Sequence, residues 1–261
     1  RVPEVTAGLL SVQNGLEPWG HVYSIQALCP ESKDGLCTET GADAPQVFLD
    51  MTAKVAASMT FRQALRAKRP LFLDGAMGTM LQASGLPAGT SPEEFCMENP
   101  DILRGIHASY LKAGVDILTS CTFGGNSYKL PKGMDVFAFN KRMATVARAA
   151  AADVPRPGDR PVFVAGNVGP TGHFIKPLGP VEPRELIEAF AQQIRGLVAG
   201  GVDLIFIETQ FDLAEARAAV VAARQECDLP VMVSMTFEQG VSLTGSTPTI
   251  LAETKQNMGR E

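Results

Sequence analysis

From Pro70 onward, short apolar runs alternate with segments in which apolar residues recur every three or four positions. The continuous runs predict strands at 71–73, 115–119, 162–166, 203–207 and 231–235. The helical spacing predicts helices at 100–113, 139–152, 185–199 and 213–226. Strands that are apolar on both faces and alternate with amphipathic helices indicate a parallel sheet covered by helices.

Polar residues gather in the loops that follow the predicted strands. These loops are rich in Gly, Thr, Asn and carboxylates, and they span 74–75, 119–126, 166–172, 208–212 and 236–245. A (β/α) barrel builds its site from loops at the carboxyl ends of many strands, whereas a Rossmann sheet concentrates its site at one switch point. No G-x-G-x-x-G follows the first predicted strand. The pattern therefore favours a barrel, with about five β/α units in this chain.

The first 58 residues carry a different pattern. Their apolar positions show no sustained period, and residues 30–45 are mostly small, polar or charged. Met59 begins a short helical pattern that leads into the first predicted strand. We expect residues 1–58 to be an extension that is loosely ordered, part of another domain or non-native. Residues 59–261 are then the N-terminal part of the barrel.

Composition and charge indicate which kinds of binding partner and which cell compartment to expect. The chain has 261 residues, 45% of them hydrophobic, and 28 acidic against 23 basic residues give a net charge of −5. Without a long basic run, no nucleic-acid partner is expected, and no apolar stretch approaches the roughly 20 residues that cross a bilayer. Five scattered cysteines without C-x-x-C spacing, and no signal-like start, predict reduced thiols and a cytoplasmic location.

Two carboxylates stand directly after predicted strands. Asp74 follows the run at 71–73, and Glu208 follows the run at 203–207. In a barrel both would point into the same mouth, where they could hold an ammonium group, act as an acid and base pair, or bind a metal. The alternative for either residue is structural, as a helix cap or as the partner of a buried arginine.

Glycine and threonine residues in the same loops indicate a site for an anion. Gly124, Gly125 and the segment 166–172 would let backbone N–H groups approach a carboxylate or a phosphate. Thr122 or Thr171 would add a hydroxyl. Tight turns explain each single glycine equally well. Taken as a set, the loops favour a small anionic or zwitterionic ligand.

The histidines and cysteines carry weaker signals. His173 follows Gly172 and is placed to meet a ligand, whereas His107 lies in the middle of a predicted helix, where packing or exposure is the default. Cys121 has no partner at metal-ligand spacing and is interpreted as a small packed residue.

Read together, the loops resemble a known family. They spell Asp74-Gly75-Ala76-Met77-Gly78-Thr79, Thr119-Ser120-Cys121-Thr122-Phe123-Gly124, Gly166-Asn167-Val168-Gly169-Pro170-Thr171-Gly172, Glu208-Thr209, Met235-Thr236-Phe237 and Ser242-Leu243-Thr244-Gly245. This series is similar to the homocysteine S-methyltransferase family and, within it, to the N-terminal homocysteine-binding module of cobalamin-dependent methionine synthases. The resemblance runs from Phe61 to the C-terminus and leaves out residues 1–58.

The resemblance implies a (β/α)8 TIM barrel that binds homocysteine and transfers a methyl group to its sulfur to form methionine. It assigns the substrate amino group to Asp74 and Glu208. The substrate carboxylate falls to the backbone amide near Gly75 and to Thr122, and Asn167 helps to orient the ligand. It also implies other modules of the same enzyme as partners.

The family's zinc ligands have no counterpart here. The resemblance implies zinc held by three cysteines after the sixth and eighth strands, and none of the five cysteines matches those positions. We therefore expect no catalytic or metal residue in this chain, weak or absent homocysteine binding, and no activity of the chain alone. Methylcobalamin as donor, recharged from methyltetrahydrofolate, would bind other modules.

Several alternatives stay open at this point. The methyl donor could be betaine or S-methylmethionine, as in single-domain relatives, or the chain could be an inactive truncated fragment. A barrel glycosidase with Glu208 as general acid would need aromatic residues at the mouth. The single tryptophan, Trp19, lies in the extension.

Overall fold

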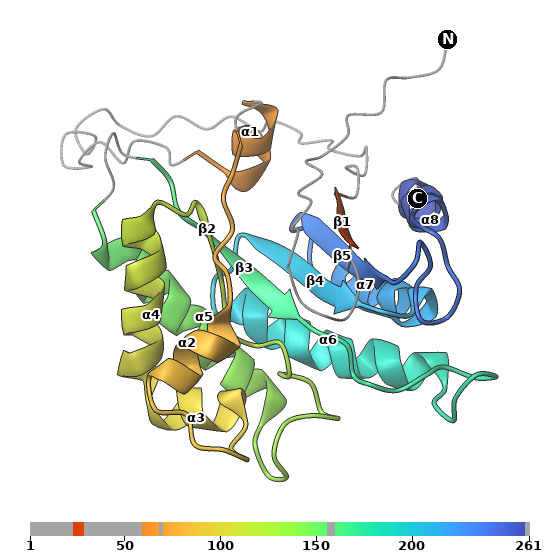
Figure 1. Ribbon diagram of the computed structural model, residues 1–261, viewed down its shortest axis with the longest axis horizontal. Coiled ribbons are helices and arrows are strands. Elements are labelled where there is room, and N and C mark those ends of the chain that lie inside the picture. Colours follow the sequence, from red (N-terminus) through yellow and green to blue (C-terminus); the bar gives the residue numbers. More distant parts are fainter. Residues whose placement is uncertain (1–22, 29–58, 68–69, 156–159, 259–261) are drawn as a thin grey trace, which may run out of the picture.

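The computed structural model describes residues 23–28, 59–67, 70–155 and 160–258, and for 23–28 it describes the backbone alone. Figure 1 shows a central sheet with helices behind it and at both of its ends. The elements in chain order are β1 (Tyr23–Leu28), α1 (Phe61–Arg66), α2 (Met77–Ala83), α3 (Pro92–Glu98), α4 (Pro100–Ala113), β2 (Ile117–Thr119), α5 (Val136–Asp153), β3 (Phe163–Val168), α6 (Pro183–Ala199), β4 (Leu204–Gln210), α7 (Leu213–Glu226), β5 (Val231–Phe237) and α8 (Pro248–Met258).

The sheet has the order β1-β5-β4-β3-β2. Neighbours from β2 to β5 are parallel, which confirms the predicted α/β fold with a parallel sheet. β1 pairs with β5 in the antiparallel sense, so that Tyr23 lies opposite Phe237 and Leu28 opposite Met232. The described strands form an open sheet, and closure into an eight-stranded barrel stays a prediction.

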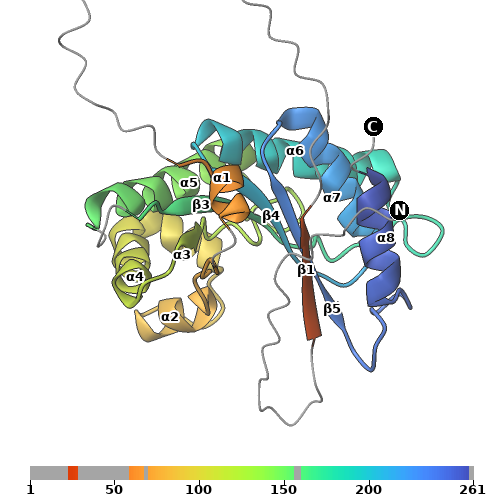
Figure 2. The same ribbon diagram turned by 90° about the horizontal axis from the view of Figure 1, so that it is seen from above.

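Both faces of the parallel strands are covered by apolar side chains. On one face, Val164 and Ile205 pack against α5, α6 and α7, which lie side by side behind the sheet (Figure 2). On the opposite face, Phe163 and Leu204 pack with Phe61 of α1. α1 begins with a capping box, in which Thr60 and Gln63 exchange side-chain and backbone hydrogen bonds. Burial on both faces explains why the strands read as continuous apolar runs.

The predicted helices at 100–113 and 213–226 are confirmed to the residue as α4 and α7. α4 ends at Gly114, whose φ of 102° places it in the left-handed region that glycine adopts without a Cβ penalty. α7 begins after Asp212, whose carboxylate accepts from two backbone N–H groups of the first turn. Local start and stop signals therefore set these boundaries.

The predicted strand at 71–73 is wrong in extent, because only an isolated parallel bridge joins Leu73 to Ile117. The backbone N–H of Phe72 donates instead to the Asp116 carboxylate at 3.1 Å. The Phe72 side chain is 60% exposed. A side chain thus replaces part of the strand pairing, and the segment keeps its place beside β2 without forming a full ladder.

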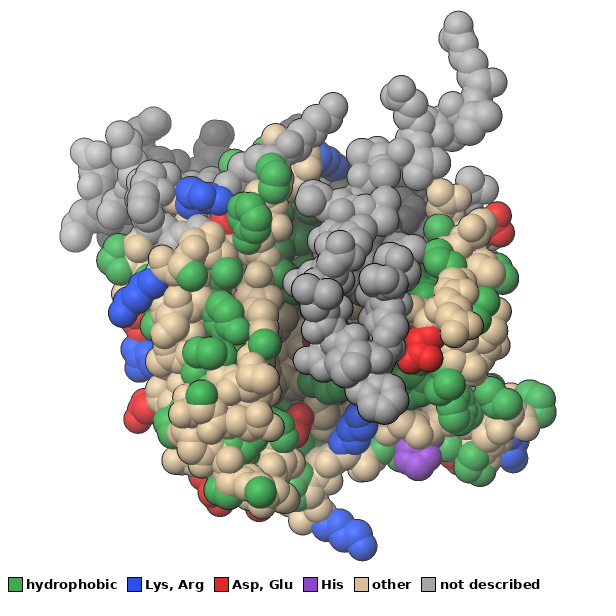
Figure 3. All heavy atoms as spheres, in the orientation of Figure 1, with side chains coloured by type: hydrophobic (Ala, Val, Ile, Leu, Met, Phe, Trp, Pro, Cys, Tyr) green, Lys and Arg blue, Asp and Glu red, His purple; other side chains and the backbone are tan. Residues whose placement is uncertain are grey.

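Two observations describe the surface of the molecule. No helix among the described residues is long and apolar enough to span a bilayer. On the face drawn in Figure 3, Lys and Arg side chains lie scattered over several elements.

Candidate functional site

The candidate site lies where the parallel strands end. In β3, the alternate residues that start at Phe163 lead to the polar Asn167. In β4, those that start at Leu204 lead to Glu208. Alternate residues of a strand share one face, so both side chains lie on the face that α1 covers at the other end of the strands. The bridge between Leu73 and Ile117 brings Asp74 to the same edge.

Asp74 is a buried carboxylate with one oxygen free of hydrogen bonds. Its side chain is 8% exposed, and Oδ2 accepts from the backbone N–H of Thr119 at 2.9 Å and from its hydroxyl at 3.2 Å. Oδ1 is buried and has no partner. Burial raises the pKa of Asp74 to about 7; the Thr119 hydrogen bonds oppose this rise, and the charge of Glu208 adds to it.

Asn167 connects the two candidate strands. Its Nδ2 donates to Oε2 of Glu208 at 2.7 Å, and its Oδ1 is buried without a partner. Burial also raises the pKa of Glu208, and the hydrogen bond from Asn167 lowers it in part. The site therefore presents unpaired buried acceptors on Asp74 and Asn167 next to a second carboxylate.

Thr122 is held tightly by its surroundings. Its hydroxyl donates to the backbone carbonyl of Asn167 at 2.6 Å and lies 2.7 Å from the hydroxyl of Ser120. Its own carbonyl accepts from Nε2 of Gln193 at 2.7 Å. Thr122 thus joins the loop after β2 to the end of β3, and its hydroxyl proton is engaged in that contact.

Gly75 occupies a more open position beside Asp74. It is exposed, and a Cβ built on it would lie 3.5 Å from the hydroxyl oxygen of Tyr110. Burial, followed by the Asp74 charge, raises the pKa of Tyr110. The structure therefore brings Asp74, Asn167 and Glu208 into one network, with Gly75 and Thr122 at its borders.

The glycines expected to cradle an anion have a different use. The N–H of Gly124 donates to Oε1 of Glu93 at 2.8 Å, and that of Gly169 donates to the carbonyl of Phe123 at 3.1 Å. A Cβ on Gly169 would lie 2.5 Å from that carbonyl oxygen. Close packing between loops explains these two glycines, and neither has the positive φ that the alternative, a tight turn, would need.

Sequence reasoning missed three residues that hold the loops. Thr119 is the hydrogen-bond partner of Asp74, and Gln193 donates to the carbonyls of Thr122 and Asn167. Glu215 is fully buried and accepts from the N–H and the hydroxyl of Thr171, both at 2.6 Å. Gln193 had a visible signal, because it lies among apolar residues on the buried side of α6.

The remaining candidates lie in other environments. The rings of His173 and Tyr128 contact each other at a tilt of 45°, with their centroids 4.7 Å apart, and His107 is fully buried in α4. Cys121 is packed, as expected, and its sulfur lies 3.7 Å from that of Cys96. Across the described residues, no three His, Cys, Asp or Glu side chains come together as a metal site, so these residues do not fit the zinc that the resemblance implies.

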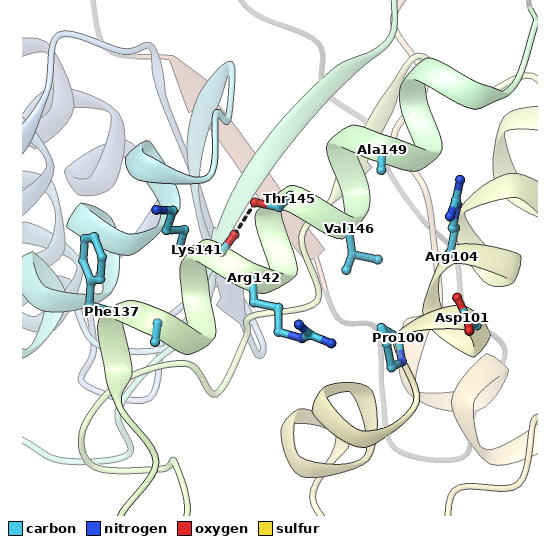
Figure 4. A pocket seen from close by; sticks show the side chains of 10 residues that line it. Pro100, Asp101, Arg104, Phe137, Lys141, Arg142, Thr145, Val146 and Ala149 are labelled. Atoms are coloured by element: carbon cyan, nitrogen blue, oxygen red, sulfur yellow. Dashed lines mark hydrogen bonds between the residues drawn. The ribbon is translucent and has the colours of Figure 1, made fainter.

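A separate groove of about 630 Å³ lies between α4 and α5. Figure 4 shows Arg142 of α5 extending toward Pro100 of α4, with Val146 of α5 on the same side of the helix. The groove contains none of the predicted site residues. We therefore place the candidate functional site at the strand ends and not in this groove.

The structure is that of an α/β protein with a cluster of buried polar side chains at the carboxyl ends of its parallel strands. Residues 71–259 match the homocysteine S-methyltransferase family. The chain belongs to this family, as its loop motifs indicated.

Individual relatives agree with this assignment. The chain is 33% identical over 195 residues to methionine synthase of Mycobacterium leprae (strain TN), across 69% of this chain and 16% of that protein. It therefore spans about a sixth of that relative.

Solved structures show the same fold. The metallated form of the homocysteine methyltransferase MmuM from Escherichia coli has a TM-score of 0.54 at 22% identity, over 65% of this chain and 64% of that one. Its oxidised form has a TM-score of 0.57 at 24% identity, over 65% and 63%.

Proposed function

We propose that this chain is the homocysteine-binding portion of a methionine synthase, an enzyme that transfers a methyl group to the sulfur of homocysteine to form methionine. Membership of the homocysteine S-methyltransferase family and the likeness to a methionine synthase support this proposal. Residues 59–261 are then the N-terminal part of a (β/α)8 homocysteine-binding barrel, and residues 1–58 are an extension. The cytoplasmic location belongs to the same proposal.

The observation that carries the proposal is the set of unpaired acceptors at the strand ends. Oδ1 of Asp74 and Oδ1 of Asn167 are buried without a partner, and Glu208 adds a carboxylate beside them. An ammonium group has three donors and no acceptor, so it matches this set. Charge-assisted hydrogen bonds to carboxylates are also stronger than neutral ones.

The raised pKa of Asp74 makes binding of an ammonium depend on pH. With a pKa of about 7, the carboxyl is largely protonated below that pH and then offers less negative charge. A bound ammonium favours the ionised form, so it draws the proton off Asp74. Affinity therefore increases as the pH rises through 7.

The other end of the amino acid is assigned to Gly75 and Thr122. Gly75 is exposed, so its backbone can approach a substrate carboxylate. Thr122 reaches that carboxylate when its hydroxyl turns away from the carbonyl of Asn167. Nε2 of Gln193, 3.2 Å from the same carbonyl, then remains as its donor.

Activation of the sulfur lies outside what the described residues supply, since they form no cluster of metal ligands. In the proposal, zinc activates the substrate thiol in the parent enzyme, and methylcobalamin and methyltetrahydrofolate act through its other modules. A homocysteine methyltransferase that uses betaine or S-methylmethionine, or a fragment without activity, stays the alternative to this proposal.

The test compares two ligands by NMR titration of the full chain. L-homocysteine and 4-sulfanylbutanoate share the thiol and the carboxylate, but only homocysteine has an ammonium group. Binding of homocysteine by this portion of the barrel alone is expected to be weak. It should still shift the amide signals of Thr119 and Asn167 and be at least about tenfold tighter than that of 4-sulfanylbutanoate, because hydrogen bonds to charged groups contribute roughly 1.5–3 kcal/mol. The affinity for homocysteine should increase by up to about tenfold per pH unit below pH 7.

A matched pair of variants isolates the carboxylate. Asp74→Asn should abolish the preference for homocysteine and its pH dependence, whereas Glu253→Gln, at an exposed position on α8, should keep both. Equal affinity for the two ligands in the wild-type protein would contradict the proposed site.

A further inference from the structure

Two buried thiols from different elements touch each other beside the candidate site. Cys96 in α3 and Cys121 in the loop after β2 lie 25 positions apart in the sequence, and their sulfur atoms are 3.7 Å apart. Cys96 is fully buried and Cys121 is 7% exposed. Cys227 packs separately at the end of α7, where its sulfur contacts the carbonyl of Ala223.

A hydrogen bond between α3 and the loop of Cys121 holds the two thiols next to each other. Glu93, one turn before Cys96 in α3, accepts from the N–H of Gly124, three positions after Cys121. Cys121 itself has a φ of 56°, in the left-handed region that non-glycine residues rarely adopt. A disulfide has an S–S length of about 2.05 Å, so the sulfur atoms must approach by roughly 1.7 Å.

We propose that Cys96 and Cys121 form a reversible intramolecular disulfide when the protein is exposed to a hydroperoxide. Neither thiol has a role in the proposed homocysteine site. The pair is therefore a modification site in addition to the ligand site.

The chemistry balances with hydrogen peroxide as the oxidant. The thiolate of Cys121, the more exposed of the two, attacks one peroxide oxygen; an S–O bond forms, the O–O bond breaks, and hydroxide leaves and is protonated to water. The Cys96 sulfur then attacks the sulfenic acid, so that the S–S bond forms, the S–O bond breaks, and a second water leaves. Two thiols lose two electrons in total, and a dithiol reductant reverses the process by exchange.

The reaction is slow at neutral pH. The hydrogen bond with Cys96, burial, and the negative charges of Glu93 and Asp74 raise the pKa of the Cys121 thiol well above its usual range. The thiolate is the reactive species, so the disulfide accumulates under sustained exposure and not within a brief pulse of oxidant.

The disulfide would tie α3 to the loop that supports the site. Thr119, the last residue of β2 just before that loop, donates twice to Asp74, and Thr122 in the loop donates to the carbonyl of Asn167. Homocysteine affinity should then differ between the reduced and oxidised protein. This consequence rests on the proposed function, whereas formation of the disulfide does not.

The test maps the cross-link directly in the full chain. The reduced protein is incubated with hydrogen peroxide, its remaining thiols are alkylated, and its non-reduced peptides are analysed by mass spectrometry. We expect a Cys96 peptide joined to a Cys121 peptide with the loss of two hydrogens, and its disappearance after treatment with dithiothreitol. Cys227→Ser should keep the joined peptide, and Cys121→Ser should lose it.

The outcomes separate the two parts of the inference. Unchanged thiols, sulfinic or sulfonic acids at positions 96 and 121, or pairing of either cysteine with another cysteine of the chain would overturn the disulfide. The wild-type map alone decides this, so the result does not depend on whether a variant folds. A cross-link that leaves homocysteine affinity unchanged would contradict only the coupling to the site.

Discussion

The side chains of His107 and Asp74 are buried, and burial shifts their pKa values in opposite directions. Burial lowers the pKa of His107 from 6.5 to about 4, and neither ring nitrogen has a hydrogen-bond partner. Burial raises the pKa of Asp74 from 3.8 to about 7. Between pH 4 and 6.5, the unfolded chain therefore binds more protons at His107, and the folded chain binds more at Asp74.

His107 and Asp74 contribute in opposite directions to the pH dependence of the free energy of unfolding. As the pH falls from 6.5 to 4, the imidazole of His107 becomes charged in the unfolded chain but stays neutral in the folded one. This lowers the free energy of unfolding by about 3 kcal/mol at most. Asp74 adds stability over nearly the same range, by about 4 kcal/mol at most, because its proton is held in the folded state. The two contributions largely cancel in the wild-type protein.

We therefore predict that His107→Leu increases in stability relative to the wild type as the pH is lowered from 6.5 to 4. Asp74→Asn should show the opposite trend and lose relative stability with acid. Urea unfolding at several pH values, followed by circular dichroism, measures both differences. Parallel profiles for the wild type and His107→Leu would show that His107 is not buried in its neutral form.

At the scale of single residues, the sequence predicted which side chains could bind a ligand but not which residues form hydrogen bonds with them. Asp74 and Glu208 were identifiable because each follows an apolar run, where parallel strands place their loops at one edge. The link through Asn167, and the support of Asp74 by Thr119, depend on side-chain directions that a linear pattern does not contain. The assignment of these residues to substrate binding stays a prediction.

Close approach between elements makes some glycines irreplaceable. A Cβ on Gly169 would lie 2.5 Å from the carbonyl oxygen of Phe123, whereas nothing lies within 4 Å of a Cβ on Gly105 in α4. Gly169→Ala should destabilise the protein by about 1–3 kcal/mol through overpacking. Gly105→Ala should stabilise it by about 0.5–1 kcal/mol, because alanine is the better helix former.

Urea midpoints at constant slope measure both glycine variants. A neutral Gly169→Ala would mean that the loops after β2 and β3 move apart freely. The matched Gly105→Ala tests whether any added methyl group disturbs this fold.

Helices were predicted more accurately than strands, for a local reason. α4 ends at Gly114 and α7 starts at Asp212, and both signals stand in the sequence itself. The strand at 71–73 depends on its neighbour, and there Asp116 takes up a backbone N–H of Phe72. Strand ends are set by such long-range pairing, so β3, β4 and β5 each extend beyond their apolar runs.

At the scale of the whole molecule, the N-terminal strand changes the picture of residues 1–58. β1 covers the edge of β5 over six residue pairs, although its sequence showed no strand period. Its partner residues on β5 run from Met232 to Phe237. The segments 1–22 and 29–58 lie outside the described residues.

Removal of β1 should uncover a sheet edge. We predict that a chain without residues 1–58 self-associates more strongly than the full chain, because the β5 backbone loses its pairing partners and can pair with another chain. A chain without residues 1–22 keeps β1 and serves as the control. Sedimentation velocity over a range of concentrations measures both. Identical behaviour of the two shortened chains would contradict a protective role of β1.

Gln193 has a consequence for protein engineering. Its single amide from α6 holds the carbonyls of Thr122 and Asn167, so the loop after β2 and the end of β3, where the next loop starts, share one anchor in the helix layer. A library that randomises exposed positions of these loops and keeps Gln193 would display new side chains on a constant frame. In the same library on a Gln193→Leu background, the loop backbone would move as well as the side chains change. A selected variant could then not be attributed to its new side chains alone.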